Sequence, residues 1–156
     1  MQNVQLKQID ILDAGLLPNS YDVIECSGVL HHMQDPARGL AALNSRLKPG
    51  GYIKIGLYSK LARQNVTAAR ELIKSLGTQS TPEGIRDFRR RIFNDDQHKL
   101  KNLSVLVNDF YSLSECRDLC FHVQEHQFTT ESLQKLLEPE NPVSYTHLTL
   151  PTKSSG

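Results

Sequence analysis

The sequence predicts an α/β fold built around a pair of parallel strands. Residues 21–27 and 52–58 are short, apolar-rich runs, which are typical of strands buried in a parallel sheet. Between them, Asp35-Pro36 predicts a helix start, with the aspartate as N-cap and the proline at the first helical position. Strand, helix and strand joined by short connections predict a βαβ unit with parallel strands. Leucines give the connecting helix one apolar face: Leu40, Leu43 and Leu47.

Three further segments complete this first part of the chain. Asn3 to Asp10 alternates apolar and polar side chains, which favours a strand. Residues 13–20 contain glycine, proline and asparagine and predict a loop. The sequence Lys-Pro-Gly-Gly at 48–51 predicts a turn that ends the connecting helix.

After residue 59 the pattern becomes helical. Val66, Ala69, Ile73 and Leu76 share one helix face, and Gly77 is placed to cap its C-terminus. A second helix starts at Thr81-Pro82, and a last one at Thr129 or Thr130, with its leucines facing inward (Leu133, Leu136, Leu137). Arginines at 86 and 89–91 suggest a nucleic-acid patch, but Glu83 and Asp87 balance them, so we interpret this run as a solvated helix face.

Composition narrows the class of protein. The 156 residues are 38% hydrophobic and 22% charged, with a formal net charge of +1, so no strong field indicates nucleic acid or an anionic membrane as a partner. No apolar run reaches the roughly 20 residues that a membrane span needs. Cys26, Cys116 and Cys120 form an odd, sparse set without a secretory signal, which predicts reduced thiols in a cytoplasmic protein.

The end of the chain carries an unusual string, PVSYTHLTLPT, from Pro142 to Thr152. Apart from its first base, the mosaic end and adapter of transposase-based sequencing libraries can encode this string, and Lys153 is consistent with the next adapter base. We therefore interpret residues 142–156 as a non-native tail and leave them out of functional arguments. The alternative is a genuine Thr-rich tail.

Motifs in residues 10–58 carry a family resemblance. They are D-I-L, then Y-D-V-I-x-C-x-G-V-L-H-H, then D-P, then L-K-P-G-G, in that order. This combination resembles the middle of class I S-adenosylmethionine-dependent methyltransferases, from the end of their third strand through their fifth. The later stretch DFYSLSECRDLCFHVQEHQFT is similar to a bacterial subgroup of that family. The resemblance covers roughly Val4 to Glu140.

The resemblance implies an incomplete Rossmann-like sheet, holding the third to fifth strands, with a helical C-terminal extension. Residues 1–59 would form the partial core, and residues 60–141 the extension with a loop on the acceptor side. Residues 21–27 and 52–58 should then pair side by side, with residues 3–10 detached from them. The chain would be part of a larger protein that can carry a partner domain on its N-terminal side.

The resemblance also implies S-adenosyl-L-methionine as cofactor. Ligands of open α/β sheets lie beyond the carboxyl ends of the strands. Asp10 stands at such an end and would accept a hydrogen bond from the adenine amino group, with the Ile11 N–H directed to the ring. Cys26, Ser27 and Gly28 end the next strand, and their backbone would face the methionyl and ribose groups. The alternative for Asp10 is a loop-capping role.

Histidines follow directly after that strand end. His31 or His32 would act as a general base on the acceptor, because a neutral imidazole titrates near neutral pH, or the pair would simply pack at the helix entrance. The catalytic residue therefore stays unknown. The acceptor pocket would be formed by His32, Tyr58, His122, Glu125 and His126.

Two rival functions remain open. The chain contains no G-x-G-x-x-G loop, so this chain alone should bind the cofactor feebly and be inactive, and a binding domain without catalysis is the first rival. The second is a zinc-dependent hydrolase, because His122-x-x-Glu125-His126 matches the inverted zinc-peptidase motif. Cys116 and Cys120 would extend that motif to a zinc cluster. The peptidase reading needs a helix at this position, whereas the alternating pattern favours an extended segment, so we expect no metal.

Overall fold

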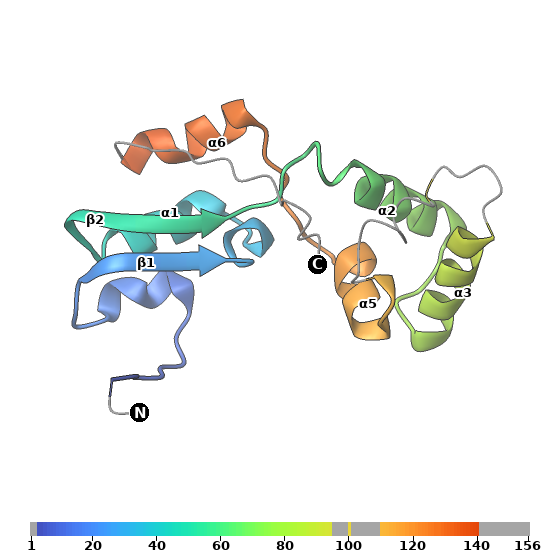
Figure 1. Cartoon of the computed structure of the whole chain (residues 1–156), viewed down its shortest axis with the longest axis horizontal. Helices are drawn as coiled ribbons and strands as arrows, with labels where there is room; N and C mark the ends of the chain where they lie inside the picture. Colours follow the sequence, from blue (N-terminus) through green and yellow to red (C-terminus); the bar gives the residue numbers. More distant parts are fainter. Residues whose placement is uncertain (1–2, 95–99, 101–109, 141–156) are drawn as a thin grey trace, which may run out of the picture.

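The computed structural model describes residues 3–94, 100 and 110–140. Residues 142–156, which we interpret as a non-native tail, lie outside the described residues. In chain order the elements are η1 (Ile11–Leu16), β1 (Tyr21–Ser27), η2 (Leu30–His32), α1 (Pro36–Asn44), β2 (Leu47–Gly56), α2 (Gln64–Leu76), α3 (Pro82–Phe93), α5 (Leu113–Phe121), α6 (Thr130–Leu137) and η4 (Glu138–Glu140). Figure 1 shows an α/β half, with β1, β2 and α1, beside a helical half, with α2, α3 and α5.

The two strands form a parallel pair, as the sequence predicts. Ile24 lies beside Ile53, Cys26 beside Ile55 and Ser27 beside Gly56. Both strands therefore end at the same edge of the sheet, and the arrows in Figure 1 point the same way. The helix between them, α1, joins these parallel strands as a crossover, because a parallel pair cannot be closed by a tight turn.

The start of β2 differs from the predicted turn. Leu47 already pairs with Tyr21, and pairing resumes between Val23 and Tyr52, so residues 48–51 form an irregularity inside the strand. Gly50 has a φ of +77°, a conformation that other residues rarely adopt. The Lys-Pro-Gly-Gly segment therefore does turn the chain, but as a bulge within β2 rather than as a separate loop.

Residues 3–10 do not form the predicted strand. They have no regular secondary structure, and among the described residues the sheet contains only β1 and β2. Leu6 is 93% exposed, so the alternating pattern has no neighbour to pack or pair with. Their predicted detachment from β1 is confirmed. Part of the loop predicted at 13–20 is helical instead, because Asp10 caps the short helix η1.

The helix α1 begins where the sequence predicts and ends earlier. The Asp35 carboxylate accepts hydrogen bonds from the backbone N–H groups of Ala37 and Arg38, which confirms its N-cap role. The helix stops at Asn44, because Leu47 belongs to β2 rather than to the helix face.

A small apolar cluster covers one face of the sheet. Cys26 of β1, Leu30 of η2 and Leu40 of α1 are its buried members, and Ile53 and Ile55 of β2 pack against them. Leu136 and Leu137 of α6 join the same cluster as partly buried residues. The opposite face stays exposed, where Lys54 and Glu25 form a surface ion pair with an Nζ–Oε1 distance of 2.7 Å.

The helical half has its own, larger core. Val66, Ala69 and Ile73 of α2 belong to one buried cluster with Ile85, Phe88 and Ile92 of α3. The other buried members of the cluster are Leu100, Phe110 and three residues of α5: Cys116, Leu119 and Cys120. The predicted face of α2 is confirmed at its three buried residues but not at Leu76, which is 41% exposed, and the left-handed Gly77 ends α2 as predicted.

Two ion pairs lie on the arginine-rich face of α3. Arg86 pairs with Glu83 and Arg90 with Asp87, each one helical turn apart. These pairs agree with a solvated, charge-balanced face at Arg86 and Arg90, whereas Arg89 is half-buried, with its guanidinium carbon 6.0 Å from the centroid of the Phe110 ring.

Candidate cofactor and acceptor site

The carboxyl end of β1 opens into a sharp turn at Gly28. This glycine has a φ of +78°, and no atom lies within 4 Å of the position where a Cβ would stand. Ser27 and Gly28 are both exposed, whereas Cys26 is buried beneath them. The strand end therefore presents backbone to open space, which is the local geometry that a ligand needs for a close approach.

Asp10 and Ile11 lie at the N-terminus of η1. The Asp10 Oδ1 accepts a hydrogen bond of 2.8 Å from the Leu12 N–H, and the residue is exposed. Ile11 packs against the cluster that contains Cys26, so η1 is anchored under the end of β1. Both roles weighed for Asp10 stay compatible, because the carboxylate caps η1 from a solvent-facing position.

Aromatic and histidine rings gather beyond the strand ends. The His31 ring stacks on Tyr58, with 4.0 Å between ring centroids, and contacts His32 at 4.3 Å. His32 in turn lies 4.1 Å from the ring of His122, which comes from the far end of α5. Four predicted pocket or catalytic residues from distant parts of the sequence therefore form one cluster, the ring cluster: His31, His32, Tyr58 and His122.

The segment between α5 and α6, residues 122–129, holds this cluster against the sheet. Its backbone N–H groups at His126 and Phe128 donate to the carbonyls of His31 (2.7 Å) and Tyr58 (2.8 Å). Figure 1 shows it crossing beyond the tips of both strands. The Gln124 side chain also donates to the Met33 carbonyl at 3.0 Å. Main-chain hydrogen bonds therefore join the segment to η2 and to the residues that follow β2.

His32 has a defined ring orientation. Its Nδ1 lies 3.1 Å from the Gln124 carbonyl oxygen. A carbonyl can only accept, so Nδ1 carries the proton in this bond and the lone pair stands on Nε2. His32 is half-buried, and in this tautomer its Nε2 is the ring atom left to accept a hydrogen bond.

His31 is a buried histidine. Its residue exposure is 1%, and neither ring nitrogen has a well-aligned hydrogen bond within the described part of the chain. Burial holds the pKa of His31 below its ordinary value, helped by the charge of His32 and opposed by Glu125. His31 is therefore a neutral packing and stacking residue, whereas the Nδ1 of His32 is bound to the Gln124 carbonyl.

Glu125 lies behind the ring cluster in an ion network. Its side chain is 0% exposed, and it accepts from Arg63 at 2.6 Å and 3.2 Å and from Arg70 at 3.0 Å. Burial acts to raise the pKa of this carboxyl, but hydrogen bonds and charges from Arg63, Arg70 and Gln127 outweigh it and hold the pKa below its ordinary value. Glu125 is therefore a carboxylate with two cationic partners.

The metal reading does not fit this geometry. The helix α5 ends at Phe121, directly before the H-x-x-E-H motif. The motif itself lies in an extended segment outside any helix. Cys116 and Cys120 are buried in the helical core. Within the described part of the chain, no group of three or more potential ligands is arranged to hold a metal ion.

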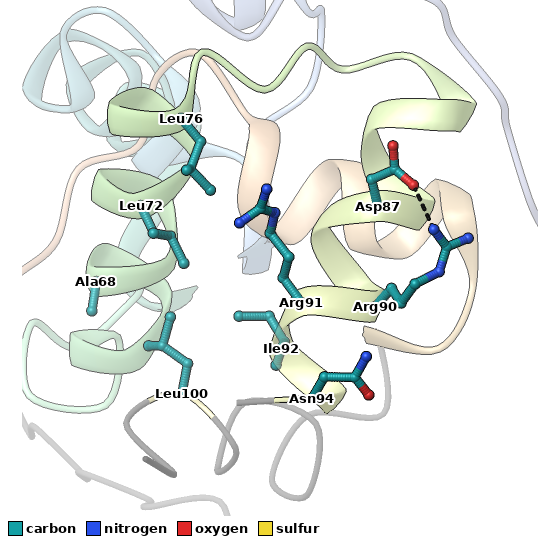
Figure 2. Close-up of a pocket in the computed structure, with 9 residues that line it drawn as sticks. All are labelled: Ala68, Leu72, Leu76, Asp87, Arg90, Arg91, Ile92, Asn94 and Leu100. Atoms are coloured by element: carbon teal, nitrogen blue, oxygen red, sulfur yellow. Dashed lines mark hydrogen bonds and ion pairs between the residues drawn. The ribbon is translucent and has the colours of Figure 1, made fainter. Parts of the chain in front are cut away.

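A large groove lies elsewhere, between α2 and α3. Its volume is about 870 Å³, and Figure 2 shows Leu72 and Leu76 of α2 facing Arg91 and Ile92 of α3 across it. It includes none of the predicted site residues. The ring cluster, rather than this groove, is the candidate site.

Sequence reasoning missed the arginines that bind Glu125. Arg63 is the N-cap residue of α2, and Arg70 lies two helical turns further on, so both can reach the same side of the helix as the buried Val66. Two arginines on an apolar helix face are a signal that a buried carboxylate elsewhere must balance them.

Comparison with known proteins finds similarity to methyltransferases. A family model described as a methyltransferase domain matches residues 1–53. An uncharacterized protein from Synechococcus sp. is 36% identical over 147 residues, which cover 86% of this chain and 34% of that protein. The mitochondrial ubiquinone biosynthesis O-methyltransferase of Schizosaccharomyces pombe is 27% identical over 124 residues, which cover 77% of this chain and 41% of that protein. The ubiquinone biosynthesis O-methyltransferase of Acinetobacter baumannii (strain AYE) is 24% identical over 118 residues, which cover 72% of this chain and 48% of that protein.

These matches support a class I S-adenosylmethionine-dependent methyltransferase. The mixed α/β structure of the chain, with a small parallel sheet, is consistent with that class. The chain spans between a third and a half of the length of these relatives. Among the described residues, no helix is long and apolar enough to cross a membrane.

Proposed function

We propose that the protein transfers a methyl group from S-adenosyl-L-methionine to a hydroxyl group of an acceptor. The match to the methyltransferase domain supports methyl transfer, and the names of two relatives include O-methyltransferase. The observation that carries the proposal is the ring cluster at the carboxyl ends of β1 and β2, next to the open turn at Gly28. We further propose that β1 and β2 are the fourth and fifth strands of a larger Rossmann-like sheet.

The residues present fit one edge of the cofactor. The open space at Gly28 would admit the methionyl and ribose groups beside the Ser27 and Cys26 backbone, and the exposed Asp10 carboxylate with the Ile11 N–H would hold the adenine. When bound, S-adenosylmethionine supplies a methyl group on a sulfonium, which is already a good electrophile. The protein's contribution is then mainly alignment of the acceptor oxygen with that methyl group.

His32 would accept the proton that the acceptor hydroxyl loses. An acceptor hydroxyl that donates to Nε2 of His32 gives up its proton as its oxygen forms the new bond to the methyl carbon and the carbon–sulfur bond breaks. The Gln124 carbonyl holds the ring in the required tautomer at 3.1 Å. The flat rings of Tyr58 and His122 lie beside it, which would suit a planar, aromatic acceptor.

The test compares wild type with His32→Gln in the full-length protein. Glutamine can still donate to the Gln124 carbonyl but cannot take up a proton. With tritiated S-adenosylmethionine and catechol as acceptor, we expect the rate to fall by about 10²–10⁴-fold. Cofactor affinity should stay unchanged. Cofactor binding without transfer to a panel of phenols and catechols would contradict the proposal and favour the binding-domain alternative.

A further inference from the structure

The buried carboxylate of Glu125 has no free hydrogen-bonding position. Oε1 accepts from the Arg63 Nε and the Gln127 Nε2, each at 3.2 Å. Oε2 accepts from Arg63 Nη2 at 2.6 Å and from Arg70 Nη2 at 3.0 Å. With 0% of the side chain exposed, nothing remains of it for an acceptor molecule to contact. Its role must therefore pass through its partners.

The first partner leads directly to the ring cluster. The guanidinium carbon of Arg63 lies 3.8 Å from the centroid of the Tyr58 ring. That ring's stacking contact with His31 is 4.0 Å between centroids. The fork of Arg63 thus binds Glu125 in two places and also lies over the face of Tyr58, so the position of the carboxylate determines where the tyrosine can stack.

The chain neighbours of Glu125 reach the two histidines. The carbonyl of Gln124 orients His32, and the N–H of His126 binds the carbonyl of His31. Arg70 links Glu125 to the helical half, because its Nη2 also donates to the Leu119 carbonyl of α5 at 2.8 Å. Glu125 therefore lies between the helical half and two residues that touch the ring cluster.

We propose that Glu125 is a positioning residue: held by Arg63 and Arg70, it fixes the orientation of the His32 imidazole and the stacking of Tyr58 on His31. The catalytic importance of this orientation rests on the proposed function, whereas the geometric role does not. A buried carboxylate with two arginine partners suits the task because the charged bonds are directional and tie α2 to the segment that crosses the strand ends.

The test uses nuclear magnetic resonance on the full 156-residue chain, without ligand. The long-range ¹H–¹⁵N spectrum reports the tautomer of His32, and cross-relaxation reports the contact between the Tyr58 and His31 rings. The variant Glu125→Gln keeps the shape of the side chain but removes its charge. Arg63→Lys keeps the positive charge but removes the planar fork. Glu25→Gln, in the exposed pair with Lys54, is the matched control.

We expect Glu125→Gln to lose both the fixed Nδ1–H tautomer of His32 and the ring cross-peak. Arg63→Lys should lose the cross-peak while circular dichroism stays that of wild type, and Glu25→Gln should lose neither. Unchanged signals in both site variants would overturn the proposal. Loss of fold in both would overturn it as well, since the pair would then determine folding rather than orientation. Because no methyl transfer is measured, this result is independent of the proposed function.

Discussion

The α/β half and the helical half of the molecule differ in how many apolar residues they bury. The α/β half carries the family motifs, yet its cluster contains three buried residues, whereas the helical cluster contains eleven, both counted over the described residues. One face of its sheet stays exposed, with Val23 at 64% and Tyr52 at 74%. The motif residues of the α/β half therefore contribute more to the strand ends than to a buried core. Most of the described apolar packing lies in the helical half.

The largest effect should come from the helical core. Phe88 is 1% exposed and packs edge-on against Phe110 and Phe121. Phe88→Ala removes a buried aromatic ring and leaves a cavity, so we expect a loss of about 3–5 kcal/mol in the free energy of unfolding. Hydrogen exchange resolved by peptide should show lost protection in α2, α3 and α5 but not in β1 or β2.

Leu40→Ala, in the sheet cluster, is the matched change in the other half. It should lower protection in β1 and β2 by about 2–5 kcal/mol and leave α3 as in wild type. Equal loss of protection across the whole chain in either variant would show that the two clusters unfold as one unit and would remove the contrast between the halves.

Acid should weaken the region where the two halves meet. The folded state holds the pKa of His31 below its ordinary 6.5, mainly by burial, so the unfolded chain binds this proton more readily. Stability should be complete above pH 6.5 and fall below it. Glu125 is also held below its ordinary 4.5, despite its burial, so its contribution should be lost as pH falls below 4.5.

Urea titrations at half-unit pH intervals measure this dependence. His31→Phe keeps a ring for stacking on Tyr58 but cannot titrate, so it should flatten the curve near pH 6 and leave the decline below 4.5. A wild-type curve that rises on acidification from pH 7 would contradict the buried, neutral state of His31.

A helix cap in the α/β half should have the smallest effect. Asp35 accepts hydrogen bonds from two N–H groups at the start of α1. Asp35→Ala should cost about 1 kcal/mol, while Asp35→Ser should retain most of the capping. Thermal unfolding measures both. Equal loss in the two variants would show that the carboxylate acts there in some way other than capping.

Local signals predicted much of the fold. The bounds of β1, the Asp35 cap and the Gly77 end of α2 follow from short patterns in the sequence, and the structure confirms them. Residues 3–10 show the limit, because an alternating pattern indicates a strand only where a neighbouring strand supplies hydrogen bonds. The bulge at 48–51 was hidden for a similar reason, since pairing on either side of it depends on β1.

The site was predicted as a set of residues but not as a geometry. His31 and His32 are about ninety residues away from His122 and Glu125, and only the packed fold brings them together. Sequence reasoning assigned Glu125 to the acceptor pocket and missed Arg63, because the charge partner of a buried group is a long-range property. The adenine-binding role of Asp10 remains a prediction.

Cofactor affinity in the full-length protein tests that prediction most directly. Asp10→Ser keeps a cap for η1 but is too short to reach an adenine amino group, and Asp13→Ser, in the same short helix, is the control. Calorimetric titration with S-adenosylmethionine should show that Asp10→Ser weakens binding by about 1.5–3 kcal/mol, roughly a 10- to 150-fold rise in Kd. Asp13→Ser should bind as wild type does. An unchanged Kd for Asp10→Ser would contradict the placement of the cofactor at this strand edge.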